Sequence, residues 1–204
     1  MHGITPKEAC ALGVKLRLYP CITFFITIKG DVEMEYRIVE KQKITVVGVV
    51  KNFGKVTANQ DAKNWQEKSG DVWLFWLEFL NEGMNELIRD KYKLYRSPFW
   101  QIGITQTLVN GETVIAIGAE SDGKDYPDLT TFEVPASTWA VFTAKGTLNQ
   151  DTHPIESLMT RIVAEWLPSS GYVKSMNYEI EVYEPGNTAS TDYTCEIWIP
   201  VKKK

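Results

Sequence analysis

The pattern of apolar and polar positions divides the chain into alternating stretches and two stretches with helical spacing. Alternation with a period of two predicts β-strands in four regions, namely 36–53, 100–120, 131–146 and 176–201. Asn110–Gly111 separates two alternating runs, which is a strong hairpin signal. Thr131–Gly146 is interpreted as a strand pair or one bent strand, and the polar stretch Lys55–Gly70 as a loop.

Two helices are predicted from apolar positions that recur every three or four residues. The first covers Asp71–Asp90, with Asp71 as its N-cap. Its apolar stripe consists of Leu77, Leu80, Met84 and Leu87. Four aromatic residues spread beyond this stripe, so we expect this helix to bury more than one face. The second helix follows Thr152 as N-cap and ends before Pro168 and Gly171.

The order of these elements repeats, because strand, helix and hairpin occur twice along the chain. We therefore predict an α+β fold built from a duplicated β-α-β-β unit, with units at about 35–125 and 126–204. The antiparallel strands are expected to form one curved sheet. Two helices are expected on one side of this sheet and a ligand cleft on the other.

Composition and charge narrow the classes of function. The chain has 204 residues and a net charge of −4, which argues mildly against nucleic acid as the main partner. No apolar run approaches the roughly 20 residues that a membrane helix needs. Three cysteines without paired spacing favour reduced thiols and a cytoplasmic protein. Two histidines cannot build a histidine metal site, and no cofactor is expected.

The last predicted hairpin places carboxylates and aromatic rings on one face. Strand side chains alternate, so one face of this hairpin is predicted to carry Glu179, Glu181, Tyr183, Thr194, Glu196 and Trp198. If residue 184 pairs with residue 193, Glu181 lies opposite Glu196. In the first hairpin, the set expected to face the helices is Ile102, Ile104, Ile115 and Ile117. The other face of that hairpin carries mostly small residues.

A glutamate in a sheet has an ordinary explanation, because antiparallel sheets often keep one solvated face. Three acidic groups on one face point further, since like charges in proximity favour either a proton or a cation. Trp198 and Tyr183 beside them would suit a flat cation, through attraction of roughly 0.5–2 kcal/mol. Both explanations stay open from the residues alone.

Several motifs resemble a known family. The segments "WLPSSGY", "YEIEVYEPG" and "CEIWIPV", together with "VPASTWAVFTAKG", resemble the GyrI-like effector-binding domains of AraC-type bacterial regulators. The resemblance covers about 36–203. Residues 1–34 resemble the end of a helix-turn-helix domain with its linker, and 35–204 the effector-binding domain. DNA contact would then need a helix-turn-helix domain that this chain does not contain.

The resemblance also implies a site. An acidic residue in the last strand of the family faces a central cleft, and Glu196 matches that position. Trp139 stands where the resemblance implies a tyrosine that lines the cleft. The alternation of side chains along the strands adds Glu181, Tyr183 and Trp198. The aromatic helix adds Trp76. The expected ligand-binding set is Glu196, Trp198, Glu181, Tyr183, Trp139 and Trp76.

Three functions follow from this reading. The favoured one is a domain of a bacterial transcription regulator that binds a cationic, aromatic or lipophilic small molecule without catalysis, with a homodimer left open. The second is a hydrolase of strained electrophilic natural products that uses the last-strand glutamate as a general base. The third is a protein-interaction module of the gyrase-inhibitor type, which exposed aromatic residues would mark.

Overall fold

The computed structural model describes residues 34–55, 62–148 and 153–204, with the backbone alone for 62–70. The predicted helix-turn-helix remnant therefore lies outside the described residues, apart from Met34. Thr152, the predicted N-cap of the second helix, also lies outside them, and the prediction is wrong by one residue because His153 is the N-cap of that helix. The chain divides into two compact units, and the described residues all belong to the second, Val32–Lys204. None of the described helices is long and apolar enough to cross a membrane.

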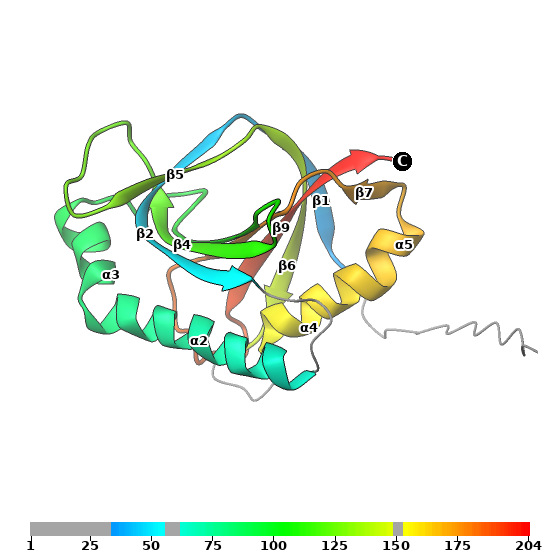
Figure 1. Cartoon of the computed structure of the whole chain (residues 1–204), viewed down its shortest axis with the longest axis horizontal. Coiled ribbons are helices and arrows are strands. Elements are labelled where there is room, and N and C mark those ends of the chain that lie inside the picture. Colours follow the sequence, from blue (N-terminus) through cyan, green and yellow to red (C-terminus); the bar gives the residue numbers. More distant parts are fainter. Residues whose placement is uncertain (1–33, 56–61, 149–152) are drawn as a thin grey trace, which may run out of the picture. The chain divides into compact units, whose positions relative to one another are not determined.

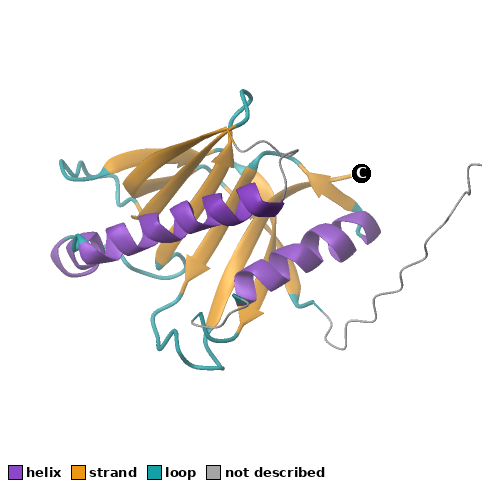
Figure 2. Ribbon diagram, turned by 60° about the horizontal axis from the view of Figure 1, so that its bottom comes forward, coloured by secondary structure: helices purple, strands orange, loops and turns teal. Residues whose placement is uncertain are grey.

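The second unit is built on one curved, antiparallel sheet of nine strands (Figures 1 and 2). The strands are β1 Tyr36–Lys41, β2 Ile44–Lys55, β3 Gln101–Thr107, β4 Glu112–Glu120, β5 Thr130–Val134, β6 Ser137–Lys145, β7 Tyr172–Lys174, β8 Tyr178–Tyr183 and β9 Thr194–Lys203. Their order across the sheet is β1-β6-β9-β8-β3-β4-β2-β5, and β7 pairs with β9. The α+β fold with a curved antiparallel sheet is confirmed.

The helices lie on one side of this sheet (Figure 2). They comprise α2 Ala62–Asn81, α3 Met84–Glu86, the π-helical turn η1 Leu87–Lys91, α4 Pro154–Arg161, the π-helical turn η2 Ile162–Trp166 and α5 Leu167–Ser169. The predicted start of the first helix at Asp71 is wrong, because α2 begins nine residues earlier. Its first half is polar but rich in Ala, Lys, Gln and Glu, which favour helices regardless of hydrophobic pattern. Gly83, in a left-handed conformation, separates α2 from α3.

The region 131–146 forms two strands, but these do not pair with each other. β5 pairs with β2, whereas β6 lies between β1 and β9. Pro135 and Ala136 lie between the two strands, and proline lacks the N–H that a continuous ladder needs. The prediction of two strands in this region is therefore correct, but each strand pairs with strands that are distant in sequence.

The predicted pairing of Glu181 with Glu196 is wrong by one residue. In the structure Glu181 lies opposite Ile197, and Val182 lies opposite Glu196. The turn between β8 and β9 is ten residues long, and Tyr193 leaves the ladder to donate its hydroxyl to the Glu184 carbonyl oxygen at 2.8 Å. Because side chains alternate, this single shift places Glu181 and Glu196 on opposite faces of the sheet.

The first hairpin shows the same kind of difference. Thr107 pairs with Thr113, so five residues separate the paired positions, rather than the two of a tight hairpin. The expected helix-facing set is consequently divided between the two faces. Ile102 and Ile104 belong to the core on the helix-free face, whereas Ile115 and Ile117 pack beneath α2. Gly103 shares the helix side with Ile117, which lies opposite it.

Three groups of buried residues fill the unit. One lies on the helix-free face and includes Ile102, Ile180 and Trp139. The second packs under α2 and the third under α4. The helix-free face, where the sequence predicts a ligand cleft, thus holds a packed hydrophobic core.

The two halves of the sheet have equivalent strand arrangements. Outward from the centre, each half has the two strands of a hairpin and then the strand that precedes the helix of that half. The order is β8, β9, β6 on one side and β3, β4, β2 on the other. Each half contains a strand, a helix and a hairpin in the same chain order, as a duplicated unit would. The central pair of strands, β3 and β8, brings Gly103 opposite Glu181. A half-buried carboxylate and a glycine therefore meet in the middle of the sheet, on the side that carries the helices.

Candidate functional site

The centre of the sheet is built around a carboxylate with a glycine beside it. Trp76 descends from α2 toward this point. A Cβ atom on Gly103 would lie 2.8 Å from Cζ2 of Trp76 and 3.5 Å from Oε2 of Glu181. Contacts under 3.0 Å are not tolerated by real Cβ atoms, so the absence of a side chain at position 103 is what lets the indole approach the carboxylate.

Tyr183 completes this arrangement from the same strand as Glu181. Its hydroxyl donates a hydrogen bond of 2.7 Å to Oε2 of Glu181. Its ring meets the Trp76 ring edge to face, with 5.2 Å between ring centroids and an angle of 72°. This is a favourable aromatic geometry. Trp76, Gly103, Glu181 and Tyr183 are referred to below as the central cluster.

The surroundings of Glu181 stabilise the uncharged form of its carboxyl group relative to that of a solvent-exposed glutamate. Burial raises the pKa of Glu181 to about 7, the carboxylates of Glu179 and Glu156 raise it further, and the Tyr183 hydrogen bond opposes the shift. Within the part of the chain whose side chains are described, no lysine or arginine forms an ion pair with Glu181. Burial also raises the pKa of Tyr183 well above its ordinary value.

The neighbouring thiol is neutral as well. Cys195 of β9 is buried, and burial, followed by the nearby carboxylate of Glu181, raises its pKa to about 12. It therefore carries no negative charge at neutral pH and supplies no nucleophile. What this region can offer chemically is one carboxylate beside a pair of packed aromatic rings, which is suited to a cation or a proton.

The other three predicted site residues lie on the helix-free face. Arg37 of β1 forms an ion pair of 2.8 Å with Oε1 of Glu196, and Trp198 Nε1 donates a hydrogen bond of 2.9 Å to Oε2. The guanidinium carbon of Arg37 lies 5.9 Å from the Trp198 ring centroid. Glu196 is therefore already paired with a flat cation, because the Arg37 guanidinium lies over the Trp198 ring and binds the carboxylate.

Trp139 is completely buried beside this group. Its ring centroid lies 6.3 Å from that of Trp198, and its Nε1 has no hydrogen-bond partner among the described residues. The six predicted site residues thus form two groups on opposite faces of the sheet. Glu181, Tyr183 and Trp76 are brought together, and so are Glu196, Trp198 and Trp139, but the two groups do not meet.

Sequence reasoning missed Gly103 and Arg37. Small residues in the first hairpin hint at a close approach, but nothing in the sequence identifies Trp76 as the residue that uses it. Arg37 lies in the first strand and Glu196 in the last, and Arg37 reaches it only because β1 and β9 both flank β6. These contacts depend on sheet order, which a pattern along the chain does not contain.

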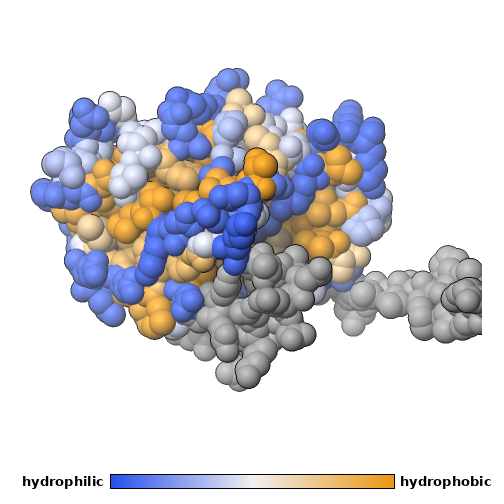
Figure 3. Space-filling model, viewed as in Figure 1, coloured by the Kyte–Doolittle hydropathy of each residue, from blue (hydrophilic) through white to orange (hydrophobic). Residues whose placement is uncertain are grey.

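An apolar strip on α2 continues outward from the central cluster. Trp73 and Leu80 lie three residues before and four residues after Trp76, so they share its side of the helix. They are 56% and 45% exposed. Figure 3 shows hydrophobic residues reaching the surface among polar ones. Exposed aromatic surface of this kind suits a lipophilic ligand or a protein partner.

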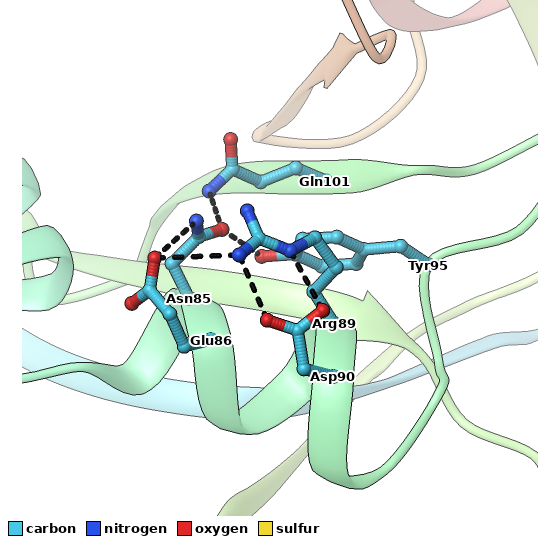
Figure 4. A network of polar contacts seen from close by, with 6 residues as sticks. All are labelled: Asn85, Glu86, Arg89, Asp90, Tyr95 and Gln101. Atoms are coloured by element: carbon cyan, nitrogen blue, oxygen red, sulfur yellow. Dashed lines mark hydrogen bonds and ion pairs between the residues drawn. The ribbon is translucent and has the colours of Figure 1, made fainter.

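A polar network fixes the segment that follows α2 (Figure 4). Asn85 of α3 accepts hydrogen bonds from the Tyr95 hydroxyl at 2.9 Å and from Gln101 Nε2 at 3.3 Å. Arg89 of η1 forms ion pairs with Asp90 and Glu86. Gln101 lies two residues before Gly103 in β3. The network therefore anchors the helical segment after Trp76 to the strand over which Trp76 packs.

The seating of Trp76 on Gly103 leads to a stability prediction. We expect Gly103→Ala to lower the free energy of unfolding by about 1–3 kcal/mol, because the added methyl group displaces a packed indole. In a Trp76→Ala background the same change should be neutral or slightly stabilising. A double-mutant cycle measured by urea unfolding tests this coupling. Equal costs of Gly103→Ala in both backgrounds would show that Trp76 does not occupy this place.

Comparisons with known proteins give one matching family model and several solved structures of similar fold. Residues 102–202 match the family model described as a GyrI-like small molecule binding domain. A comparison with curated protein sequences gave no match. The chain is similar in structure to SAV2435, solved bound to tetraphenylphosphonium, with a TM-score of 0.67 and 20% identity over 83% of this chain and 94% of that one.

Other solved structures agree on the fold. A Staphylococcus aureus MU50 protein, provisionally assigned to bacterial transcription regulation, has a TM-score of 0.66 and 22% identity over 83% of this chain and 99% of that one. An integron cassette protein of Vibrio cholerae has a TM-score of 0.52 and 16% identity, over 82% and 95% of the two chains. At these identities the likeness shows the fold alone.

Proposed function

Because residues 102–202 form a GyrI-like small molecule binding domain, we propose that this chain binds small organic cations through the central cluster. Glu181 supplies the counter-charge, and Trp76 and Tyr183 supply the aromatic surfaces. The observation that carries the proposal is a half-buried carboxyl group at the centre of the sheet that has no ion-pair partner among the described side chains and that accepts a hydrogen bond from Tyr183, whose ring packs against Trp76.

The carboxylate and the aromatic rings of the central cluster would each stabilise a bound cation. A buried carboxylate that lacks a counter-ion is costly, so a cation that pairs with it recovers part of the desolvation free energy. An aromatic ring within about 6 Å of a cation adds roughly 0.5–2 kcal/mol. Trp76 and Tyr183 already lie in contact at this carboxylate. The exposed Trp73 and Leu80 next to them would extend the apolar surface for a lipophilic cation.

The comparison with SAV2435 supports the same ligand class, since that protein was solved with tetraphenylphosphonium, a lipophilic organic cation. Likeness to a Staphylococcus aureus protein linked with transcription supports a role as the effector-binding part of a regulator. DNA contact would then be made by a domain outside the described residues. The second group, around Glu196, is the alternative ligand site, and it would require a ligand to replace Arg37.

A hydrolase remains the second candidate function, and one observation favours it. Glu181 has a pKa of about 7 and a tyrosine hydroxyl at 2.7 Å, so it can accept a proton from water near neutral pH while Tyr183 assists a leaving oxygen. Multiple turnovers of a strained electrophile by the wild-type protein, lost in Glu181→Gln, would support this candidate. Stoichiometric binding without product would leave the binding function alone.

The proposed function is tested by tryptophan fluorescence. Tetraphenylphosphonium is expected to quench the fluorescence of the wild-type protein in a saturable way, because it would contact Trp76. Tetraphenylmethane analogues made soluble by neutral groups are the matched control, and they should bind at least about tenfold more weakly, since they leave the carboxylate unpaired. Equal binding of the charged and neutral compounds would contradict the proposal.

A further inference from the structure

The contacts of Glu181 suggest that its ligand competes with a proton. We propose that an organic cation enters the central cluster in exchange for one proton held by Glu181, so that acidity sets the apparent affinity. This inference rests on the cation-binding function proposed above and adds its regulation. The exchange balances simply: the carboxylic O–H bond breaks, the proton leaves to solvent, and the resulting carboxylate pairs with the cation.

The hydrogen bonds around Glu181 fit a protonated resting state. Within the described residues its carboxyl group has one hydrogen bond to a side chain, from the Tyr183 hydroxyl to Oε2. An ionised carboxylate can accept about four hydrogen bonds, so a buried carboxylate with a single donor is poorly satisfied. A carboxylic acid needs fewer donors. Tyr183 can donate to either form, which means that the site need not rebuild when the proton leaves.

Among the described side chains, the surrounding elements supply no positive charge that would hold Glu181 ionised. On its own strand lie Tyr183, which is neutral, and Glu179, which pairs with Lys174 at 2.8 Å. Helix α4 contributes Glu156, and β9 contributes the neutral thiol of Cys195. From α2, Trp76 packs on Gly103 of β3, which lies opposite Glu181, and neither residue carries a charge. The charged groups that face Glu181 are therefore acidic and favour the bound proton.

The size of the effect follows from the titration range of this carboxyl group. Its pKa of about 7 makes the proton and the cation competitors within the physiological range. For one competing proton, the apparent dissociation constant should rise about tenfold between pH 8 and pH 6. Binding at pH 6 should release close to one proton per cation, and binding at pH 8 close to none. A carboxylate with an ordinary pKa would show neither change.

Isothermal titration calorimetry tests this exchange directly. Tetraphenylphosphonium is titrated into the wild-type protein at pH 6, 7 and 8, in pairs of buffers with different ionisation enthalpies, which report the number of protons released. We expect proton release to fall across this series and the affinity to increase. Glu181→Gln is the control, and any binding that it retains should release no protons.

The outcomes separate the two proposals. Absence of binding by the wild-type protein at all three pH values would overturn the proposed function, and with it this inference. Binding with the same affinity from pH 6 to pH 8, without proton release, would overturn the inference alone. Unchanged proton release in Glu181→Gln would also overturn it, because the proton would come from another group. The wild-type series stands by itself if the variant folds poorly.

Discussion

Replacing Glu181 with glutamine is expected to raise the free energy of unfolding at pH 8 by up to about 3 kcal/mol and to leave stability at pH 4 almost unchanged. The carboxyl group has a pKa of about 7 in the folded protein and 4.5 as its ordinary value. Between these values the folded state binds more protons than the unfolded state. Wild-type stability should therefore fall as pH rises from about 4.5 through 7.

Glutamine keeps the shape of the side chain and carries no charge, so the variant should lack this decline. Urea unfolding of both proteins at pH 4, 6 and 8 measures the difference. Glu179→Gln is the matched control on the same strand, because its surface pair with Lys174 is worth under about 1 kcal/mol. Parallel pH profiles for the wild type and Glu181→Gln would mean that desolvation does not raise the pKa of Glu181 in the folded protein.

Gly48→Ala should destabilise the fold by about 3 kcal/mol or more. Gly48 of β2 lies opposite Gly118 of β4, and a Cβ on Gly48 would lie 2.0 Å from the carbonyl oxygen of Ile117. A Cβ on Gly118 would lie 2.1 Å from the carbonyl oxygen of Val47. Both contacts are with backbone atoms in the core ladder, which cannot move without loss of hydrogen bonds.

Gly171→Ala provides the control, since nothing lies within 4 Å of a Cβ at that position. It is expected to change the free energy of unfolding by less than about 0.5 kcal/mol. Urea unfolding of the three proteins gives the comparison. A loss below 1 kcal/mol for Gly48→Ala would show that β2 and β4 are farther apart at this pair than the structure places them.

The sequence pattern predicts the fold well because most of its signals are local. The helix that begins at Pro154 and the strands around Asn110–Gly111 follow from helical spacing, turn residues and alternation. The start of α2 does not, because its first turns lack an apolar stripe in the sequence. Both hairpins have loops of a different length from the predicted ones. Their strands are therefore as predicted, but the two strands of each hairpin pair in another register, which changes which side chains share a face of the sheet.

The candidate site was predictable only in part. Strand parity alone singles out Glu181 and Tyr183, which lie two residues apart on one face. The approach of Trp76 over Gly103 depends on how α2 crosses β3, and this crossing leaves no local trace in the sequence. The same holds for Arg37, which neutralises Glu196 from a strand at the sheet edge. The prediction of Glu196 as a ligand-binding carboxylate stays a prediction.

The central claim is that a cation binds against Glu181 on the helix side of the sheet. The most direct measurement is the dissociation constant of tetraphenylphosphonium at pH 8 for the wild type, Glu181→Gln and Glu196→Gln. We expect Glu181→Gln to weaken binding at least about tenfold, since the variant removes the counter-charge, and Glu196→Gln to change it less than about threefold. Loss of binding in Glu196→Gln, with wild-type affinity in Glu181→Gln, would contradict the account and place the ligand on the opposite face.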